Sequence, residues 1–335
     1  MARKSVLPWV VGALGAALAV LPAQAEVAKV RIAQQLSLAF LPAMVMQKEK
    51  LLEAEMEKAG MRDVPVEWST FAGGNSAIDA VLAGELQFAS SGITPFITLW
   101  AKSNGRVKGV AAMSAQPEYL NCRNPALKSV RDLTIKDKIA VPAIKVSTQA
   151  VFLQMEAART WGDANFEKLD PMTVSLSQAD ASIALMSGSG DIACTFTSQP
   201  FTFLQKKDPG IHTILNSFDT LGGPATLTMV WATVDFQKNN PKTYAAFLAA
   251  YEKALGIIRN DKKRAAQIYL DLSKDKSLSN ADVVSIISDP QITFVMTPEN
   301  TMKSVNFMNQ VGRINKRPAS WRDMWFENVH SLSGS

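Results

Sequence analysis

The chain has 335 residues, of which 47% are hydrophobic and 19% charged, and its formal net charge is +5. A chain of this size can bury a sizeable core and would fold as one or two domains, which excludes a disordered or fibrous protein. Its positive charges form no concentrated stripe, so we expect no nucleic acid as a partner.

The first 25 residues have the pattern of a secretory signal peptide. Arg3 and Lys4 give a positive start, residues 6–21 are uncharged and apolar, and residues 23–25 read Ala-Gln-Ala, a small-x-small cleavage site. The apolar stretch is shorter than the roughly 20 residues of a spanning helix, which argues against a membrane anchor. No cysteine directly follows it to carry a lipid. We therefore expect a free periplasmic protein, with a net charge of +3 after loss of Arg3 and Lys4.

Two cysteines, Cys122 and Cys194, occur in the whole chain. In an exported protein a disulfide between them is chemically permitted. The sequence gives no distance between the two residues, and a disulfide needs closely placed Cα atoms. Of the two interpretations, we favour two separate buried thiols.

The first third of the mature chain alternates strand and helix patterns. Strands are expected at residues 27–35, 64–71 and 85–91, where apolar and polar residues alternate or small apolar residues run together. One helix is expected over residues 41–60, one after Gly73-Gly74 with Asn75 or Ser76 as its cap, and one from Thr94. This order predicts an α/β sheet that is mainly parallel.

The same order returns after residue 136, with strands at 137–145, 172–177 and 191–196 and helices at 146–162, 178–190 and 198–207. The stretches "AVLAGELQFASSGITPF" and "ALMSGSGDIACTFTSQPF" share the same order of features: a small apolar helix end, Gly, an acidic residue, a strand that ends in small residues, Ser or Thr, Pro and Phe. This indicates two lobes of similar architecture. The chain would leave the first lobe near residues 115–125 and return near 212–236, where two strands are separated by a Gly-Gly-Pro break. From Pro241 onward the pattern is helical, with Asn240 and Ser279 as caps.

No nucleotide, metal or catalytic motif is found. The chain lacks a Walker loop and a Gly-rich turn after its first strand, which phosphate and dinucleotide sites require. Its two histidines, His212 and His330, are far apart in the sequence, and neither cysteine has a partner at metal-ligand spacing. No G-x-S-x-G turn is present. We expect no cofactor, no metal and no enzymatic activity.

Small polar residues instead follow each expected strand, in "LSLAFLP", "FAGGNS", "SSGIT", "IKVSTQ" and "TFTSQP". The carboxyl ends of parallel strands are where α/β sheets bind ligands, and helix N-termini there offer unpaired N–H groups. Each stretch alone is an ordinary helix cap. Together they predict a donor-rich cleft suited to an anionic or acceptor-rich ligand.

With these features in place, the chain resembles a periplasmic substrate-binding protein of an ABC importer. More narrowly, it is similar to the nitrate/sulfonate/taurine group, also described as the aliphatic-sulfonate-binding and thiamine-pyrimidine-synthase-like family. The residues that carry the resemblance are "GGNSAIDAVLAGELQFASSGITPF", "SVRDLTIKDKIAVP" before "VSTQAVFLQ", and "GDIACTF". It implies a two-lobed periplasmic-binding-protein fold of type II with two hinge crossovers. The expected lobes are residues 26–116 plus 220–335, and 117–219.

The resemblance also implies ligand contacts from both lobes and from the crossovers. In the first lobe these are Ser37, Leu38, Phe40, Gly74, Asn75, Ser76, Ser91, Gly92 and Ile93. In the second lobe they are Val146, Ser147, Thr148, Gln149, Thr195 and Thr197. Near the crossovers they are Gln116, Glu118 and Asp219.

The implied function is capture of a small organic anion, a sulfonate or carboxylate, by hinge closure, and delivery by a monomer to an ABC permease. Phe40, Phe71, Tyr119 and Phe196 lie near the cleft loops and are compatible with an aromatic or alkyl tail. Lys145 is the one cation beside a strand end, so a neutral heterocycle such as a pyrimidine stays an alternative. Two further alternatives are a pyrimidine-synthase-like enzyme, which the missing histidine and cysteine cluster argues against, and a sensor that reports to a membrane kinase.

Overall fold

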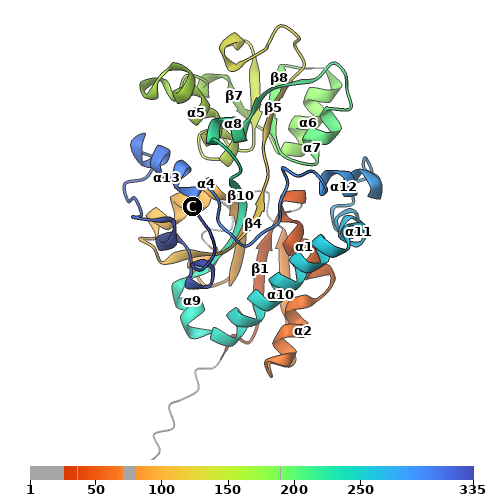
Figure 1. The fold of residues 1–335 in the computed structure, drawn as a ribbon, viewed down its shortest axis with the longest axis vertical. Helices are drawn as coiled ribbons and strands as arrows, with labels where there is room; N and C mark the ends of the chain where they lie inside the picture. Colours follow the sequence, from red (N-terminus) through yellow and green to blue (C-terminus); the bar gives the residue numbers. More distant parts are fainter. Residues whose placement is uncertain (1–25, 36, 71–79, 189) are drawn as a thin grey trace, which may run out of the picture.

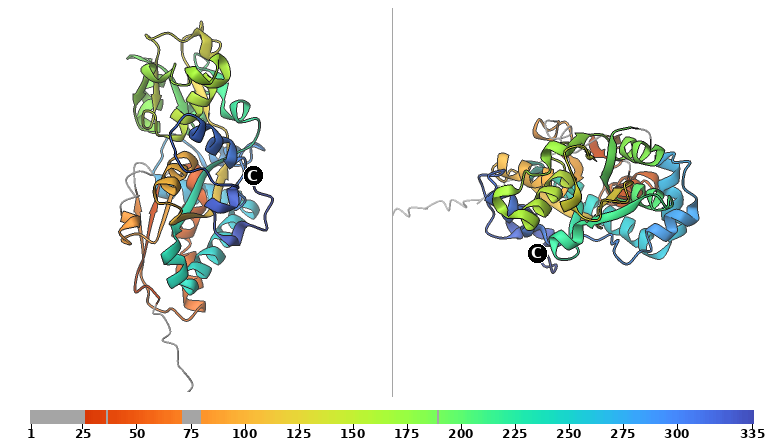
Figure 2. Two further views of the ribbon diagram at one scale, coloured as in Figure 1. Left: turned by 90° about the vertical axis from the view of Figure 1, so that its left-hand side faces the viewer. Right: turned by 90° about the horizontal axis from the view of Figure 1, so that it is seen from above.

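The structure is a computed structural model that describes residues 26–35, 37–70, 80–188 and 190–335. These residues form two five-stranded sheets, each with helices packed around it, in two lobes stacked along the long axis of the molecule (Figures 1 and 2). The first lobe is the lower one in Figure 1, and the second lobe, with β5, β7 and β8, is the upper one. The expected signal peptide lies outside the described residues.

The sheet of the first lobe has the strand order β2-β1-β3-β10-β4. Its strands are β1 Val30–Gln34, β2 Val66–Thr70, β3 Phe88–Gly92, β4 Val107–Ala115 and β10 Thr226–Thr233. β1 is parallel to β2 and to β3, whereas β10 is antiparallel to both of its neighbours.

The sheet of the second lobe repeats this plan with the order β7-β6-β8-β5-β9. Its strands are β5 Tyr119–Cys122, β6 Lys138–Val141, β7 Thr173–Ser175, β8 Ile192–Thr197 and β9 His212–Asn216. β6 is parallel to β7 and β8, and β5 is antiparallel to β8 and β9. The two lobes therefore share one architecture, as the sequence predicts.

Each sheet is mainly parallel, as the sequence predicted: four of its five strands run in one direction, and only β10 in the first sheet and β5 in the second run against them. The antiparallel pairings come from β10 and β5, the strands on which the chain enters each sheet from the other lobe. A strand that arrives from the opposite lobe runs against strands that point toward the cleft. β4 continues through residues 116–118 into β5, and the chain returns after α8 into β10. The lobe boundaries at residues 116 and 220 stay a prediction.

Helices cover the faces of both sheets. Those of the first lobe are α1 Leu41–Lys48, α2 Leu51–Lys58, α4 Ile93–Lys102, α9 Val234–Asn239, α10 Pro241–Asn260, α11 Lys262–Ser273, α12 Asn280–Ile286 and α13 Thr301–Gln310. Those of the second lobe are α5 Thr148–Trp161, α6 Gln178–Ser187, α7 Phe201–Gln205 and α8 Ser217–Leu221. No helix of the described residues is long and apolar enough to span a membrane.

Three local predictions need correction. The helix expected over residues 41–60 breaks at Lys50, whose φ of 50° is left-handed and separates α1 from α2. Asn240 does not cap α10 through its side chain, because its Oδ1 accepts the N–H of Val27 at 2.8 Å instead. The C-terminal stretch after Ser320 forms two short 3₁₀ turns, Trp321–Met324 and Glu327–Val329, and no α-helix. Ser279 does cap α12, as predicted.

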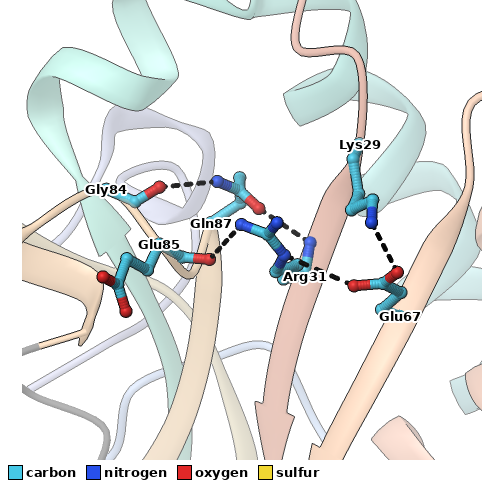
Figure 3. Close-up of polar contacts among 6 residues, drawn as sticks. All are labelled: Lys29, Arg31, Glu67, Gly84, Glu85 and Gln87. Atoms are coloured by element: carbon cyan, nitrogen blue, oxygen red, sulfur yellow. Dashed lines mark hydrogen bonds and ion pairs between the residues drawn. The ribbon is translucent and has the colours of Figure 1, made fainter.

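Polar contacts fix the register of β1 with its neighbours at the strand starts, away from the cleft (Figure 3). Glu67 of β2 accepts from Lys29 at 2.7 Å and from Arg31 at 3.3 Å, and Arg31 and Glu67 are directly paired in the parallel ladder. The buried side chain of Gln87 bridges the Arg31 N–H, at 2.7 Å, and the Gly84 carbonyl, at 3.0 Å. The charged pairs are exposed and add little stability, whereas Gln87 satisfies buried backbone groups.

Cys122 and Cys194 form a disulfide bond. The interpretation of two separate thiols is therefore wrong. The sequence could not show that the two residues are directly paired across the antiparallel strands β5 and β8, with their Cα atoms 4.1 Å apart. Such cross-strand positions bring two Cβ atoms within reach of one bond.

We expect the Cys122→Ala, Cys194→Ala double variant to lose about 4 kcal/mol of unfolding free energy, because the bond closes a loop with a sequence separation of 72 residues. Urea denaturation of both proteins measures the difference. The wild type under reducing conditions is the control and should match the variant. Two free thiols titrated in the unfolded, unreduced protein would contradict the bond.

Candidate functional site

A cavity of about 420 Å³ lies between the two lobes. The first lobe contributes Gln35, Ser37, Ala39, Phe40, Gly92, Pro95, Leu227 and Thr228 to its lining. The second lobe contributes Pro142, Ala143, Ser147, Thr148, Gln149, Ser177, Gln178, Ala179, Ser198 and Phe201, and Glu118 comes from the crossover between β4 and β5. The cavity thus sits at the carboxyl ends of β1, β3, β6, β7 and β8, where the sequence predicts ligand binding.

The N-terminus of α5 lies at this cavity, with Ser147, Thr148 and Gln149 among the lining residues. Ser147 is the N-cap: its Oγ accepts from the Ala150 N–H at 3.2 Å and donates to the Ala143 carbonyl at 2.8 Å. The backbone N–H groups of Thr148 and Gln149 make no hydrogen bond to the described part of the chain. The first turn of this 14-residue helix therefore offers unpaired donors and the positive end of a helix dipole.

The two lobes touch beside the cavity. The Thr94 hydroxyl at the start of α4 donates to the Thr148 hydroxyl at 3.4 Å. Gly92 allows this approach, because a Cβ at its position would lie 2.3 Å from the Thr148 Oγ1. The absence of a side chain at Gly92 is thus required by the close contact, and not by its backbone conformation, whose φ is −64°.

Glu118 is the one ionisable residue among the described residues that line the cavity. Its side chain is 0% exposed, and its Oε1 accepts from the Gln149 side-chain amide at 2.5 Å. Its Oε2 has no hydrogen-bond partner in the described part of the chain. Burial raises the pKa of the Glu118 carboxyl to about 8, although the Gln149 hydrogen bond lowers it.

Seven of the predicted contact residues line the cavity: Ser37, Phe40, Gly92, Glu118, Ser147, Thr148 and Gln149. Three more, Gly74, Asn75 and Ser76, lie outside the described residues, as does Phe71. The cavity therefore brings together predicted residues from both lobes and from one crossover, although these are distant in the sequence.

Four predicted residues of the first lobe and its crossover are buried but do not line the cavity: Leu38, Ser91, Ile93 and Gln116. Leu38 and Ile93 belong to the hydrophobic core. The Ser91 hydroxyl accepts from the Trp231 ring N–H at 3.1 Å, and the Gln116 amide donates to the Ser114 hydroxyl at 3.3 Å. Direct sequence neighbours of Leu38, Ser91 and Ile93 line the cavity, namely Ser37, Ala39 and Gly92, and Glu118 lies two residues beyond Gln116.

Thr195 and Thr197 are buried inside the second lobe, away from the cavity lining. Thr197 shares a hydrogen bond with Thr202 of α7 at 3.1 Å, in a polar network that also holds Asn121 and Gln205. Successive strand residues face opposite sides of a sheet, which places these two threonines under α7. Ser198, one residue beyond the strand, lines the cavity instead.

Val146 and Asp219 are exposed, and neither lines the cavity. Asp219 lies on α8 and lines a separate hollow of about 310 Å³ together with Arg131, Glu156 and Arg159. Lys145 does not reach the cavity either, because its ammonium lies 3.5 Å from Glu167. No lysine, arginine or histidine is among the described lining residues.

Sequence reasoning missed further lining residues, among them Gln35, Ser198, Phe201 and two groups on α6 and β10. Ser177 and Gln178, at the start of α6, follow β7 as a cap, so the rule applied to the other strand ends would have found them. Leu227 and Thr228 lie on β10, which is antiparallel, and no strand-end rule applies to them. Among the described residues, no cluster of His, Cys, Asp or Glu could hold a metal ion.

No protein-family model matches the chain, and no curated protein sequence matches it. Solved structures do match. The alkanesulfonate-binding protein SsuA from Xanthomonas axonopodis pv. citri, bound to MOPS, has a TM-score of 0.69 at 18% identity, over 90% of this chain and 99% of that one. The periplasmic aliphatic sulphonate-binding protein SsuA from Escherichia coli has a TM-score of 0.67 at 17% identity, over 90% and 93% of the two chains.

The chain has the fold of the periplasmic binding proteins. This confirms the fold class predicted from the sequence, and sulfonate-binding proteins are among the matches, as the resemblance implied. A Candida albicans gene product described as having the generic periplasmic-binding-protein fold also matches, with a TM-score of 0.64 at 16% identity, over 87% of this chain and 92% of that one. At these identities the likeness shows the fold, and the ligand must be argued from the cavity.

The buried Glu118 should make stability depend on pH. Its pKa is about 8 in the folded protein against an ordinary value of 4.5, so the folded state binds the proton more tightly. The free energy of unfolding should therefore fall as pH rises from about 4.5 to about 8, by on the order of 4 kcal/mol, and level off above that.

Urea denaturation of the wild type and of Glu118→Gln at several pH values measures this dependence of the unfolding free energy on pH. The fall between about pH 4.5 and pH 8 should be absent from Glu118→Gln. Glu57→Gln, at an exposed position of α2, controls for the loss of one acidic group. Parallel pH profiles of the wild type and Glu118→Gln would show that Glu118 does not titrate as described.

Proposed function

We propose that this protein is the solute-binding component of an ABC importer and that it captures a small organic anion, a sulfonate or a carboxylate. The observation that carries the proposal is the cavity between the lobes, at whose wall α5 begins with Thr148 and Gln149, whose N–H groups are unpaired in the described part of the chain. Such a helix end binds anionic groups without needing a cationic side chain. The Ser37 hydroxyl adds a further donor beside it, whereas the hydroxyls of Ser147 and Ser198 already donate to the Ala143 carbonyl and the Gln178 side chain.

The rest of the lining favours an organic ligand over an inorganic ion. Phe40, Phe201 and Leu227 give the cavity an apolar part that an alkyl or aromatic tail would fill. A volume of about 420 Å³ is within the range of small-molecule sites and far larger than nitrate needs. We therefore assign the anionic head to the α5 end and the tail to these side chains.

Periplasmic localisation and a membrane permease as partner belong to the same proposal. Structures with this fold include ligand-binding proteins of ABC-type import systems, among them one from Staphylococcus aureus, with a TM-score of 0.65 at 15% identity over 91% of this chain and 99% of that one. The signal-peptide pattern of residues 1–25 fits export. We propose a monomer that binds solute and does not transform it, because no nucleophile paired with a base is found among the described lining residues.

A neutral heterocycle is the second candidate ligand. It is favoured by the lack of any lysine, arginine or histidine among the described lining residues and by three side-chain amides, those of Gln35, Gln149 and Gln178. Amides offer both donors and acceptors, which suits the mixed edge of a pyrimidine. The two ligand classes differ in charge, so matched charged and neutral probes separate them.

Thermal-shift measurements should show that benzoate and butanesulfonate raise the melting temperature of the mature protein, because a ligand that binds the native state stabilises it. Benzamide and butanesulfonamide, their neutral counterparts, should give no shift at the same concentration. Nitrate and cytosine complete the panel. A shift with the neutral compounds alone would establish the second candidate in place of the anion.

Two substitutions at Thr148 should separate the backbone donor from the hydroxyl. Thr148 is the first residue of α5, where proline is tolerated, and Ser147 before it is already extended. Thr148→Pro removes the N–H and should weaken anion binding by about 10- to 150-fold, the worth of a hydrogen bond to a charged group. Thr148→Ala keeps the N–H and should lose less. Calorimetry that finds equal losses would place the anion elsewhere.

We also propose that the lobes rotate about the crossovers and close on the ligand. Gly92→Ala should then weaken binding, because the new Cβ would lie 2.3 Å from the Thr148 hydroxyl and hold the lobes apart. Overpacking of about 1–3 kcal/mol corresponds to roughly 5- to 150-fold in affinity. Gly256→Ala in α10 is the control, since its Cβ meets nothing within 4 Å. Unchanged affinity and X-ray scattering in Gly92→Ala would argue against closure at this contact.

A further inference from the structure

We propose that Glu118 binds the anionic ligand while its own side chain is a neutral carboxylic acid. The O–H of Glu118 then donates a hydrogen bond to an oxygen of the bound anion. The inference rests on the proposed function, and it deepens it by naming the residue that couples ligand binding to a proton. It also restricts the ligand's group at this point to an acceptor, which excludes an ammonium or another strong donor there.

The position of Glu118 supports this role. The Gln149 side chain donates to Oε1 of Glu118 at 2.5 Å, while the backbone N–H of the same Gln149 is one of the unpaired donors of α5. Glu118 therefore lies within the length of one side chain of the place where the anion would bind. Its Oε2 is buried and without a partner in the described part of the chain, so a ligand can complete its hydrogen bonding.

The state of the carboxyl follows from its surroundings. A carboxylate that is 0% exposed and has no cation beside it among the described residues is far more costly than the neutral acid. A second negative charge on a bound ligand would raise that cost further. The acid form removes the repulsion and supplies the donor that the anion needs.

Among the described residues of the elements around Glu118, no charged group contributes to its pKa shift. On α5, Arg159 is paired with Glu156 at 2.8 Å. On α8, Asp219 is exposed and faces the separate hollow. On β5, burial raises the pKa of Tyr119 to about 12, so its hydroxyl stays neutral.

Beyond Tyr119 lie two more charges. Lys206 sits over the Tyr119 ring at 4.0 Å, and burial lowers the pKa of its ammonium. Asp289 is close enough to raise the pKa of Tyr119. The Glu118 pKa of about 8 is set by burial and by Gln149, with neither of these charges among its causes. A pH experiment on the cavity would therefore report the titration of the Glu118 carboxyl itself.

The coupling predicts how affinity changes with pH. Benzoate and butanesulfonate stay ionised above pH 6, so the change must come from the protein. Wild-type affinity for either probe should fall about tenfold between pH 7 and pH 9, as Glu118 loses its proton with a pKa near 8. Glu118→Gln keeps the shape and presents an amide N–H where the acid has its O–H. Its affinity should stay within about threefold of wild type at pH 7 and should not change up to pH 9.

Infrared difference spectra of the wild type minus Glu118→Gln, recorded without ligand, test the protonation directly. A protonated-carboxyl band should be present at pH 7 and disappear above pH 9. If Glu118→Gln does not fold, Gln149→Met serves in its place: it removes the hydrogen bond that lowers the Glu118 pKa and should move the wild-type midpoint to higher pH.

Three results would overturn the inference: no acid band at pH 7, a loss of more than about tenfold in Glu118→Gln at pH 7, or the same pH profile with and without Glu118. The second of these would show that the carboxylate form binds a donor of the ligand. If neither probe binds the wild type at pH 7, the proposed ligand class fails, and the infrared band then decides the state of Glu118 alone.

Discussion

The pairing of β10 with β3 and β4 is the constraint on which the rest of the molecule depends. β10 brings the chain back from the second lobe into the middle of the first sheet, so it joins the lobes and completes the core at once. Its Trp231 is fully buried and donates to the Ser91 hydroxyl, and its Thr228 donates to the Ala39 carbonyl at 2.7 Å while lining the cavity. One strand therefore joins the two lobes, completes the core and lines part of the cavity.

The chemistry of the cavity is that of fixed dipoles more than of charges. Its donors come from a helix end, hydroxyls and amides, which are held by the fold and need no reorganisation when a ligand binds. Glu118 is the one ionisable group among the described lining residues, and burial raises its pKa to about 8. A site of this kind would discriminate by the geometry of hydrogen bonds and would depend only weakly on salt, because no exposed charge pair contributes to it.

The sequence predicted the parts of this structure that follow from local rules. Strand and helix alternation gave two lobes, and the rule that polar strand ends bind ligands found Ser37, Ser147 and Thr148. The rule failed where contact with the cavity depends on the side of the sheet that a side chain faces or on the direction of its strand. Thr195 and Thr197 belong to the right strand but face α7, and Thr228 lies on a strand that runs the opposite way. The Cys122–Cys194 bond depends on a strand pairing that no local pattern contains.

Weak contacts on both sides of the cavity link the lobes. α12 and α13 lie at opposite flanks of the boundary (Figure 1). On the α12 side, Lys207 pairs with Asp282 at 2.9 Å, and on the α13 side Gln310 donates to Asp163 at 2.5 Å. Exposed pairs of this kind contribute about 0–1 kcal/mol each. Contacts this weak would not prevent the proposed rotation of the lobes.

In the closure proposed above, the balance between open and closed lobes would then be decided inside the cavity. A ligand that bonds Thr148 and Gln149 of α5 as well as residues of the first lobe gains contacts only when both lobes are in place. A few hydrogen bonds to a charged group, at about 1.5–3 kcal/mol each, outweigh the flanking pairs. The same comparison explains the glycine at position 92. In the proposed closure, a side chain at position 92 would clash with Thr148. The free-energy cost of this overpacking would be as large as the gain from the ligand's own hydrogen bonds.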